Sequence, residues 1–224
     1  MPDRKHWRIL VYIAIGLFIL CIPLLLLTSH LTWAVNDLQL HEQSFDKYNV
    51  SRDTGISEEE LHAVAVGLIS YFNSGEVGEA LDIFDEREMI HLRDVRGLIV
   101  LNYRLQEAVC AYIALFIIAG SLWLRGRFLV PLAKMALGGG VLTLFVIAVL
   151  GIAALVDFDW LFVAFHRIFF SNDYWILGGY LPRIFTVGFF SDTAMLIATA
   201  IAIESLVLSG IGGFFVIRGR RAGA

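Results

Sequence analysis

Cysteine is scarce in this sequence, and internal repeats are absent. Cys21 and Cys110 are its only two cysteines, and both fall inside apolar runs. A disulfide framework is therefore not expected, and both residues are interpreted as small buried side chains. No segment recurs at a fixed period and no low-complexity tract is present, which excludes a solenoid.

The chain also has too few polar residues for an ordinary soluble domain, because 58% of its residues are hydrophobic. A helix that crosses a membrane needs about 20 mostly apolar residues to span a hydrocarbon layer of ~30 Å. Four stretches meet this need, at residues 7–28, 98–124, 135–156 and 194–217. They are continuously apolar and lack the alternation of a barrel strand, which predicts helices. We expect one integral membrane domain over residues 1–224.

Basic residues indicate how the four predicted spans are oriented. They cluster before the first span, between the second and third, and after the fourth: Arg4, Lys5, Arg8, Arg125, Arg127, Lys134, Arg218, Arg220 and Arg221. If the four helices alternate, all these residues lie on one side, which the positive-inside rule makes cytoplasmic. Both termini are then cytoplasmic, and segments 37–96 and 157–193 lie on the outer side. The first apolar core is longer than the ~7–15 residues of a signal peptide, so we expect a retained helix.

The first outer segment is acidic and predicted to form a helical cap. Ser57 precedes three glutamates, 58–60, a pattern typical of a helix N-cap with carboxylates in the first turn. An apolar stripe at helical spacing follows, made of Leu61, Val64, Leu68 and Tyr71. Three nearby histidines are expected to be ordinary surface residues: His30, His41 and His62.

A first histidine motif, HLRDVR, ends this segment at residues 91–96. His91 and Asp94 are spaced i, i+3, which places them on one face of a helix. An aspartate there can fix the tautomer of the imidazole and leave the other ring nitrogen as a base or ligand. Spacing alone favours a simpler interpretation, a surface ion pair at a helix entry with Arg93 and Arg96 as anchors.

The second outer segment is rich in aromatic residues. Residues 158–190 contain twelve of them, but Asp159, Pro182 and the glycine pair 178–179 interrupt the run. It is too broken to span the membrane and too apolar for a solvated loop, so we predict an interfacial or re-entrant segment. His166 lies in its middle. Two interpretations fit His166 equally well. It belongs either to a binding or catalytic site, or to an aromatic anchor whose polar residues face water.

Two other interpretations use the same polar residues differently. A metal-dependent membrane hydrolase could use His91, His166, Asp94 and Asp173 as ligands, although a compact zinc signature such as H-E-x-x-H is absent. A non-catalytic partner or transporter subunit could use Glu204, which falls near mid-depth in the last span and is costly there unless protonated or paired.

Two motifs together resemble one family. The sequence reads His-x-x-Asp-Val-Arg at residues 91–96 and Phe-His-x-x-Phe-Phe-x-Asn-Asp-x-Trp at residues 165–175. These motifs, their order and the arrangement of spans resemble the lipoprotein intramolecular transacylases of Gram-positive bacteria. The resemblance implies an all-α membrane protein with four transmembrane helices, an extracytoplasmic helical cap and an aromatic interfacial segment. It also implies transfer of an acyl chain from the diacylglyceryl group on a lipoprotein's N-terminal cysteine to that cysteine's α-amino group, which gives a lyso-form lipoprotein.

The resemblance further implies which residues act and where. His91 and His166 correspond to the family's essential histidines, and six motif residues would support them: Asp94, Arg96, Phe169, Asn172, Asp173 and Trp175. No metal or cofactor is implied. The expected partners are a diacylated bacterial lipoprotein and membrane lipids, with no nucleic acid. The expected location is the bacterial cytoplasmic membrane, with the active site at its outer face. The chain departs from the family at Thr186 and Val187, where a Pro-Glu pair is usual.

The implied reaction needs little beyond proximity and proton transfer, because the ester and the amine belong to one molecule. No serine or cysteine nucleophile accompanies the motifs, which favours direct transfer over an acyl-enzyme. We expect one histidine to deprotonate the amine and the other to polarise the ester or protonate the leaving alkoxide. Asp94 and Asp173 are expected to orient the rings. The sequence does not assign the two roles.

Overall fold

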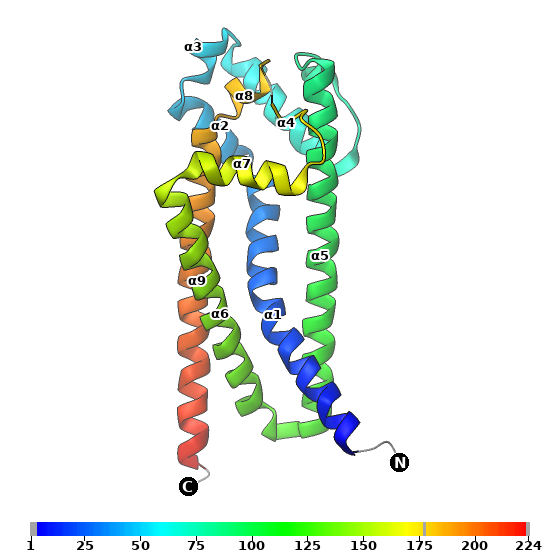
Figure 1. Cartoon of the computed structure of the whole chain (residues 1–224), viewed down its shortest axis with the longest axis vertical. Helices are drawn as coiled ribbons and strands as arrows, with labels where there is room; N and C mark the ends of the chain where they lie inside the picture. The colour runs from blue at the N-terminus through cyan, green and yellow to red at the C-terminus, as the bar shows by residue number, and fades with distance from the viewer. Residues whose placement is uncertain (1–3, 177, 223–224) are drawn as a thin grey trace. The chain divides into compact units, whose positions relative to one another are not determined.

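A computed structural model describes residues 4–176 and 178–222, and every regular element within those residues is a helix. This confirms the predicted all-α class. In chain order (Figure 1), the α-helices are α1 (Arg4–Asn36), α2 (Leu38–Lys47), α3 (Val50–Thr54), α4 (Glu58–Ser74), α5 (Glu86–Leu124), α6 (Leu129–Val156), α7 (Phe158–Phe169), α8 (Leu181–Ile184) and α9 (Val187–Ala222). Two short 3-10 helices, η1 (Glu79–Leu81) and η2 (Arg125–Arg127), lie between them.

In the part of the chain that the structure describes, four helices are long and apolar enough to cross a membrane: α1, α5, α6 and α9. Each contains one of the four predicted spans, so that prediction is confirmed, but all four helices extend beyond the predicted limits. With 39 residues, α5 is about 58 Å long, whereas the hydrocarbon layer is ~30 Å thick. The charged first turns of α5, which include the first histidine motif, therefore lie outside the apolar part of the helix that would cross the membrane.

The chain divides into two compact units. One, called here the membrane unit, comprises the residues up to His30, Leu105–Leu150, and the residues from Ile197 on. The other, called the histidine unit, comprises Leu31–Arg104 and Gly151–Leu196. Both histidine motifs belong to the histidine unit.

Small residues allow the helices of the membrane unit to approach one another closely. A Cβ atom at Gly139 of α6 would overlap Ile22 of α1, and one at Gly140 would overlap the Ser209 hydroxyl of α9. Such close approach is how helices associate in lipid, where hydrophobic burial gives no advantage. Large apolar side chains point away from the packed interior on every long helix, for example Leu10, Leu115, Phe145 and Leu206. This outer surface suits a lipid environment.

The histidine unit has a conventional apolar core built largely on α4. The predicted stripe of Leu61, Val64, Leu68 and Tyr71 is fully buried there. Ser57 accepts a hydrogen bond from the Glu60 amide, and the Glu60 carboxylate accepts one from the Ser57 amide in return. This capping box starts the helix as the sequence predicts. Gly75 ends it at φ 86°, in the left-handed region where glycine has no steric penalty.

Two of the three expected surface histidines are wrongly predicted. His41 is only 5% exposed, and its Nε2 lies 3.2 Å from the Ala34 carbonyl oxygen. His30 is partly buried in the membrane unit, where its Nε2 lies 3.5 Å from Glu204. His30 is covered because α1 continues past residue 28. His41 lies on α2, where the end of α1 and the rings of Phe185 and Phe189 pack against it. His62 is exposed, as expected, and pairs with Glu42.

Leu68→Ala should destabilise the histidine unit by about 2–5 kcal/mol, because it removes a fully buried side chain and leaves a cavity. Val66→Ala is the matched control on the same helix, since Val66 is 44% exposed. Chemical unfolding in detergent, followed by circular dichroism, should show a clear loss for Leu68→Ala and little change for the control. Equal losses would contradict the assignment of the α4 stripe to the core.

Candidate functional site

The first histidine motif lies in the early turns of α5. Asp85 caps this helix by accepting a hydrogen bond from the Glu88 amide at 2.8 Å. His91 lies one turn after Glu88 and is 7% exposed. Arg96, at the end of the motif, donates from Nε to the Tyr71 carbonyl oxygen at 3.0 Å. Arg96 therefore binds the C-terminal end of α4, where free carbonyls carry partial negative charge, and has a structural contact there.

The second motif begins on α7, and this helix fixes the ring of His166. Asp157 caps α7 by accepting from the Trp160 amide at 2.9 Å. Near the other end, His166 Nδ1 lies 2.7 Å from the Phe162 carbonyl oxygen. A carbonyl oxygen can only accept a hydrogen bond, so Nδ1 must carry the hydrogen. The neutral ring then has its lone pair on Nε2.

The two motif histidines meet inside the histidine unit. Their ring centroids are 5.9 Å apart with an interplanar angle of 30°, and each side chain is 7% exposed. Phe170 packs against both rings, at 5.0 Å from His91 and 5.4 Å from His166. The tertiary fold thus brings together two imidazoles that are 75 positions apart in the sequence.

Aromatic side chains enclose His166 in particular. Four rings have centroids within about 4–6 Å of it: Phe162 at 4.2 Å, Phe165 at 5.5 Å, Phe170 at 5.4 Å and Trp175 at 5.0 Å. Burial among these rings lowers the pKa of His166 from its ordinary value of 6.5, because the imidazolium would lose hydration. The hydrogen bond to Phe162 acts in the opposite direction but is the smaller effect. The neutral, Nε2-basic form of His166 is therefore favoured.

A side-chain hydrogen bond connects the two motifs directly. The Asn172 amide donates to Asp94 Oδ2 at 2.8 Å. The next residue, Asp173, accepts a hydrogen bond from the Arg87 guanidinium through its backbone oxygen, at 2.6 Å. Both contacts attach the segment after α7 to the beginning of α5.

These contacts differ from the expected roles of the two aspartates. Asp94 binds Asn172, and His91 Nδ1 is buried with no hydrogen-bond partner among the described residues. The His166 ring is oriented by a backbone carbonyl, whereas Asp173 uses its own carbonyl to bind Arg87. The i, i+3 spacing made a His91–Asp94 contact possible on α5, but Asn172 reaches the same carboxylate from another segment.

The remaining predicted site residues have other surroundings. Trp175 packs on His166, as described, whereas Phe169 is 52% exposed and packs at a tilt against Phe165, with 4.8 Å between the ring centroids. At the departure from the family pattern, the Thr186 hydroxyl accepts from the Phe189 amide at 3.2 Å and so supports the start of α9.

Two residues of the site were missed by sequence reasoning. Phe162 orients His166 by its backbone, which no side-chain pattern reveals, although its position four residues earlier on a helix is the relevant spacing. Glu88 is 1% exposed and binds backbone amides beside the site. Its signal is the Asp-x-x-Glu sequence at residues 85–88, a capping box at the start of α5.

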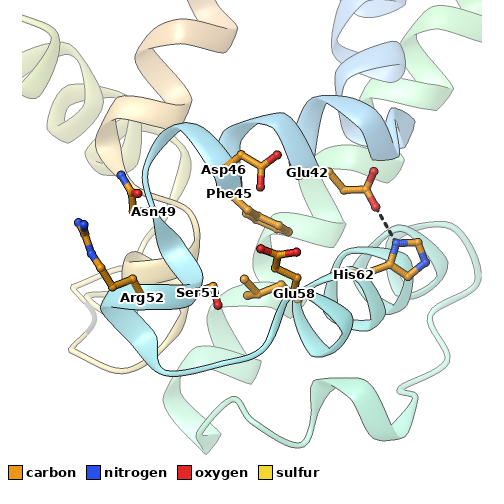
Figure 2. Close-up of a pocket in the computed structure, with 9 residues that line it drawn as sticks. Glu42, Phe45, Asp46, Asn49, Ser51, Arg52, Glu58 and His62 are labelled. Carbon is orange, nitrogen blue, oxygen red and sulfur yellow. Dashed lines mark hydrogen bonds and ion pairs between the residues drawn. The ribbon is translucent and has the colours of Figure 1, made fainter.

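A separate polar groove of about 500 Å³ lies elsewhere in the histidine unit. Figure 2 shows its lining, in which the carboxylates of Glu42, Asp46 and Glu58 are accompanied by Arg52 and His62. A dashed line marks the hydrogen bond between His62 Nδ1 and Glu42. Neither His91 nor His166 lines this groove. Among the residues that the structure describes, no group of three or more histidine, cysteine or acidic side chains is placed to hold a metal ion.

Comparison with known proteins gives one consistent result. Residues 16–190 match the family model described as lipoprotein intramolecular transacylase Lit. The fold is similar to the structure of the membrane integral lipoprotein intramolecular transacylase Lit from Bacillus cereus, with a TM-score of 0.79 and 22% identity over 97% of this chain and 100% of that one. It is also similar to a histidine-to-alanine mutant of that protein, with a TM-score of 0.73 and 21% identity over 97% of each chain. The search of curated proteins gave no match.

The Asp94–Asn172 hydrogen bond should appear as a coupling energy in a double-mutant cycle. Asp94→Ala, Asn172→Ala and the double variant should give a coupling of about 1 kcal/mol or more in free energy of unfolding, because one partner is charged. Asp159→Ala is the control for Asp94→Ala, since Asp159 is exposed on α7. Its effect should add to that of Asn172→Ala. A coupling near zero between Asp94 and Asn172 would contradict the contact.

Proposed function

The chain belongs to the lipoprotein intramolecular transacylase family, and we propose that its buried histidine pair carries out the acyl transfer. The substrate is a lipoprotein whose N-terminal cysteine bears a diacylglyceryl group. The amine nitrogen of that cysteine attacks an ester carbonyl on the same molecule, a C–N bond forms and the C–O bond to glyceryl breaks. The products are an amide and a free glyceryl hydroxyl. The observation that supports this best is the meeting of His91 and His166 inside an aromatic enclosure.

His166 is proposed as the general base. Its Nδ1 is occupied by the Phe162 carbonyl, which leaves Nε2 with the lone pair. Burial keeps the ring neutral at pH values where an ordinary histidine is partly protonated. Nε2 takes the proton that the amine loses on attack, and returns it to the glyceryl oxygen as the C–O bond breaks. The histidine ends the reaction in its starting state.

His91 is proposed to stabilise the negative charge that develops on the ester oxygen. Its Nδ1 is buried and has no hydrogen-bond partner among the described residues, so an N–H there can point to a bound substrate without breaking an existing bond. A preformed donor in a water-poor site stabilises an oxyanion more strongly than water does. His166 is thus proposed as the base and His91 as the group that stabilises the oxyanion, an assignment that the sequence did not make.

The surroundings of the pair fit a lipid substrate. On α7 and the segment after it, several apolar side chains are exposed: Trp160, Phe165, Ile168, Phe169 and Ile176. Such a surface can contact membrane lipids and the acyl chains of the substrate. The basic residues near the ends of the spans support cytoplasmic termini, which would put the histidine motifs at the outer face of a bacterial cytoplasmic membrane.

Replacing either motif histidine should abolish the lyso-form product. The test expresses the full-length protein in a bacterium that makes only diacylated lipoproteins and determines the N-terminus of one reporter by mass spectrometry. His91→Ala and His166→Ala should each reduce the product at least 100-fold, because each removes a group that acts on the reacting atoms. His62→Ala is the control, since this histidine is exposed and pairs with Glu42, away from the two motifs. Normal product from either motif variant would refute the two-histidine mechanism.

The ionisation of His166 gives a test that does not depend on turnover. NMR of histidine-labelled protein, assigned with the His166→Ala variant, should show a His166 pKa below 6.5, because burial disfavours the imidazolium. The neutral base is then present above this lowered pKa and is lost as the pH falls through it. Trp175→Ala should raise the pKa towards the ordinary value by admitting water. A pKa at or above 6.5 in the unaltered protein would contradict the assignment of His166 as a buried neutral base.

A further inference from the structure

Glu88 is a buried charged residue that the proposed reaction does not use. Its side chain is 1% exposed. A buried carboxylate is costly unless hydrogen bonds replace its hydration. Both oxygens of Glu88 have such bonds: Oε2 accepts from the Asp85 amide at 3.0 Å, and Oε1 accepts from the Leu181 amide at 2.7 Å.

The bond to Leu181 connects two distant parts of the chain. Leu181 begins α8 and follows, in the sequence, a segment made here of residues 170–176 and 178–180, which comes after α7. This segment supplies Phe170 and Trp175, the two rings from beyond α7 that pack on His166. The Glu88 carboxylate therefore binds the far end of the segment, while Asp94 binds Asn172 near its beginning.

The two anchors flank His91 on α5. Glu88 lies three residues before His91 and Asp94 lies three residues after it. Positions three apart on a helix are neighbours on its surface. The same stretch of α5 thus carries His91 together with Glu88 and Asp94, the two side chains that hold the segment packed against His166.

Gly179 shows how closely the segment approaches this carboxylate. A Cβ atom at residue 179 would overlap the Glu88 carboxylate, whereas one at Gly178 would meet nothing within 4 Å. The neighbouring glycines thus form a matched pair. A side chain at residue 179 would force Glu88 or the backbone to move, whereas one at residue 178 would not.

We infer that Glu88 is a positioning residue for the histidine pair: its carboxylate holds Gly179 and Leu181 on α5, so that Phe170 and Trp175 keep His166 facing His91. This inference rests on the proposed acyl transfer. Small displacements of reacting groups are enough to slow a reaction by about 100-fold. A loosened segment should therefore reduce the rate of the chemical step more than it reduces substrate binding.

The test compares purified full-length variants in detergent with a diacylated lipopeptide as substrate. Glu88→Gln keeps the volume of the side chain but places an NH2 donor opposite one of the two backbone amides, and Gly179→Ala displaces the carboxylate from the loop side. Each should lower kcat about 10-fold or more with KM changed less than about threefold. The controls are Glu86→Gln, an exposed glutamate in the same turn, and Gly178→Ala, and both should have unaltered kcat.

A rescue measurement separates positioning from general destabilisation. Glu88→Asp shortens the side chain by one methylene and leaves room for a Cβ at residue 179. The double variant Glu88→Asp/Gly179→Ala should be several-fold more active than Gly179→Ala alone, whatever the thermal stability of the two proteins.

Three results would overturn the inference: full kcat in Glu88→Gln and Gly179→Ala, equal losses in Gly178→Ala and Gly179→Ala, or no gain in the double variant. The unaltered protein and His166→Ala are measured in parallel. Absence of product from the unaltered protein would reject the proposed function itself, whereas normal product from it together with any of those three results would reject only the role of Glu88.

Discussion

The hydrogen bond from Asn172 to Asp94 joins segments that are 78 positions apart, and the arrangement of the site depends on it. One partner lies on α5, a continuous helix whose later part is apolar enough to cross a membrane. The other lies in an irregular segment that has only short helices on either side. An irregular segment cannot fix its own position, because its backbone has few internal bonds. The rigid helix therefore supplies the reference for the second histidine motif as well as the first.

Burial of the histidine pair has an energetic cost and a chemical consequence. Excluding water raises the cost of an imidazolium, so His166 is kept neutral, and the Phe162 carbonyl selects the tautomer with a basic Nε2. His91 Nδ1 has no partner among the described residues. Buried polar atoms without partners are uncommon in folded proteins and are often found at functional sites.

The two units meet different demands. The membrane unit exposes apolar side chains and packs through glycine and small polar residues, as expected for helices surrounded by lipid. Its acidic residue Glu204 lies 3.5 Å from His30 Nε2, and a polar partner reduces the cost of an acidic side chain inside a membrane. The histidine unit instead has a conventional apolar core, capped helices and buried polar bonds. Catalytic geometry is proposed only for this second unit, where backbone and side-chain hydrogen bonds can fix it.

The residues alone are enough to predict the helical class, the four spans, the capped α4 with its buried stripe, and the two histidine motifs. Each of these depends on local rules of apolar length, helical periodicity and capping, which act over a few turns of chain. The partners of the polar residues depend instead on the three-dimensional arrangement: Asn172 for Asp94, the α4 carbonyl for Arg96 and the Leu181 amide for Glu88. The burial of His41 depends on it too. Spacing along one helix shows which contacts are possible. Which contact forms depends on what a distant segment brings to the same place, and sequence spacing carries no information about that.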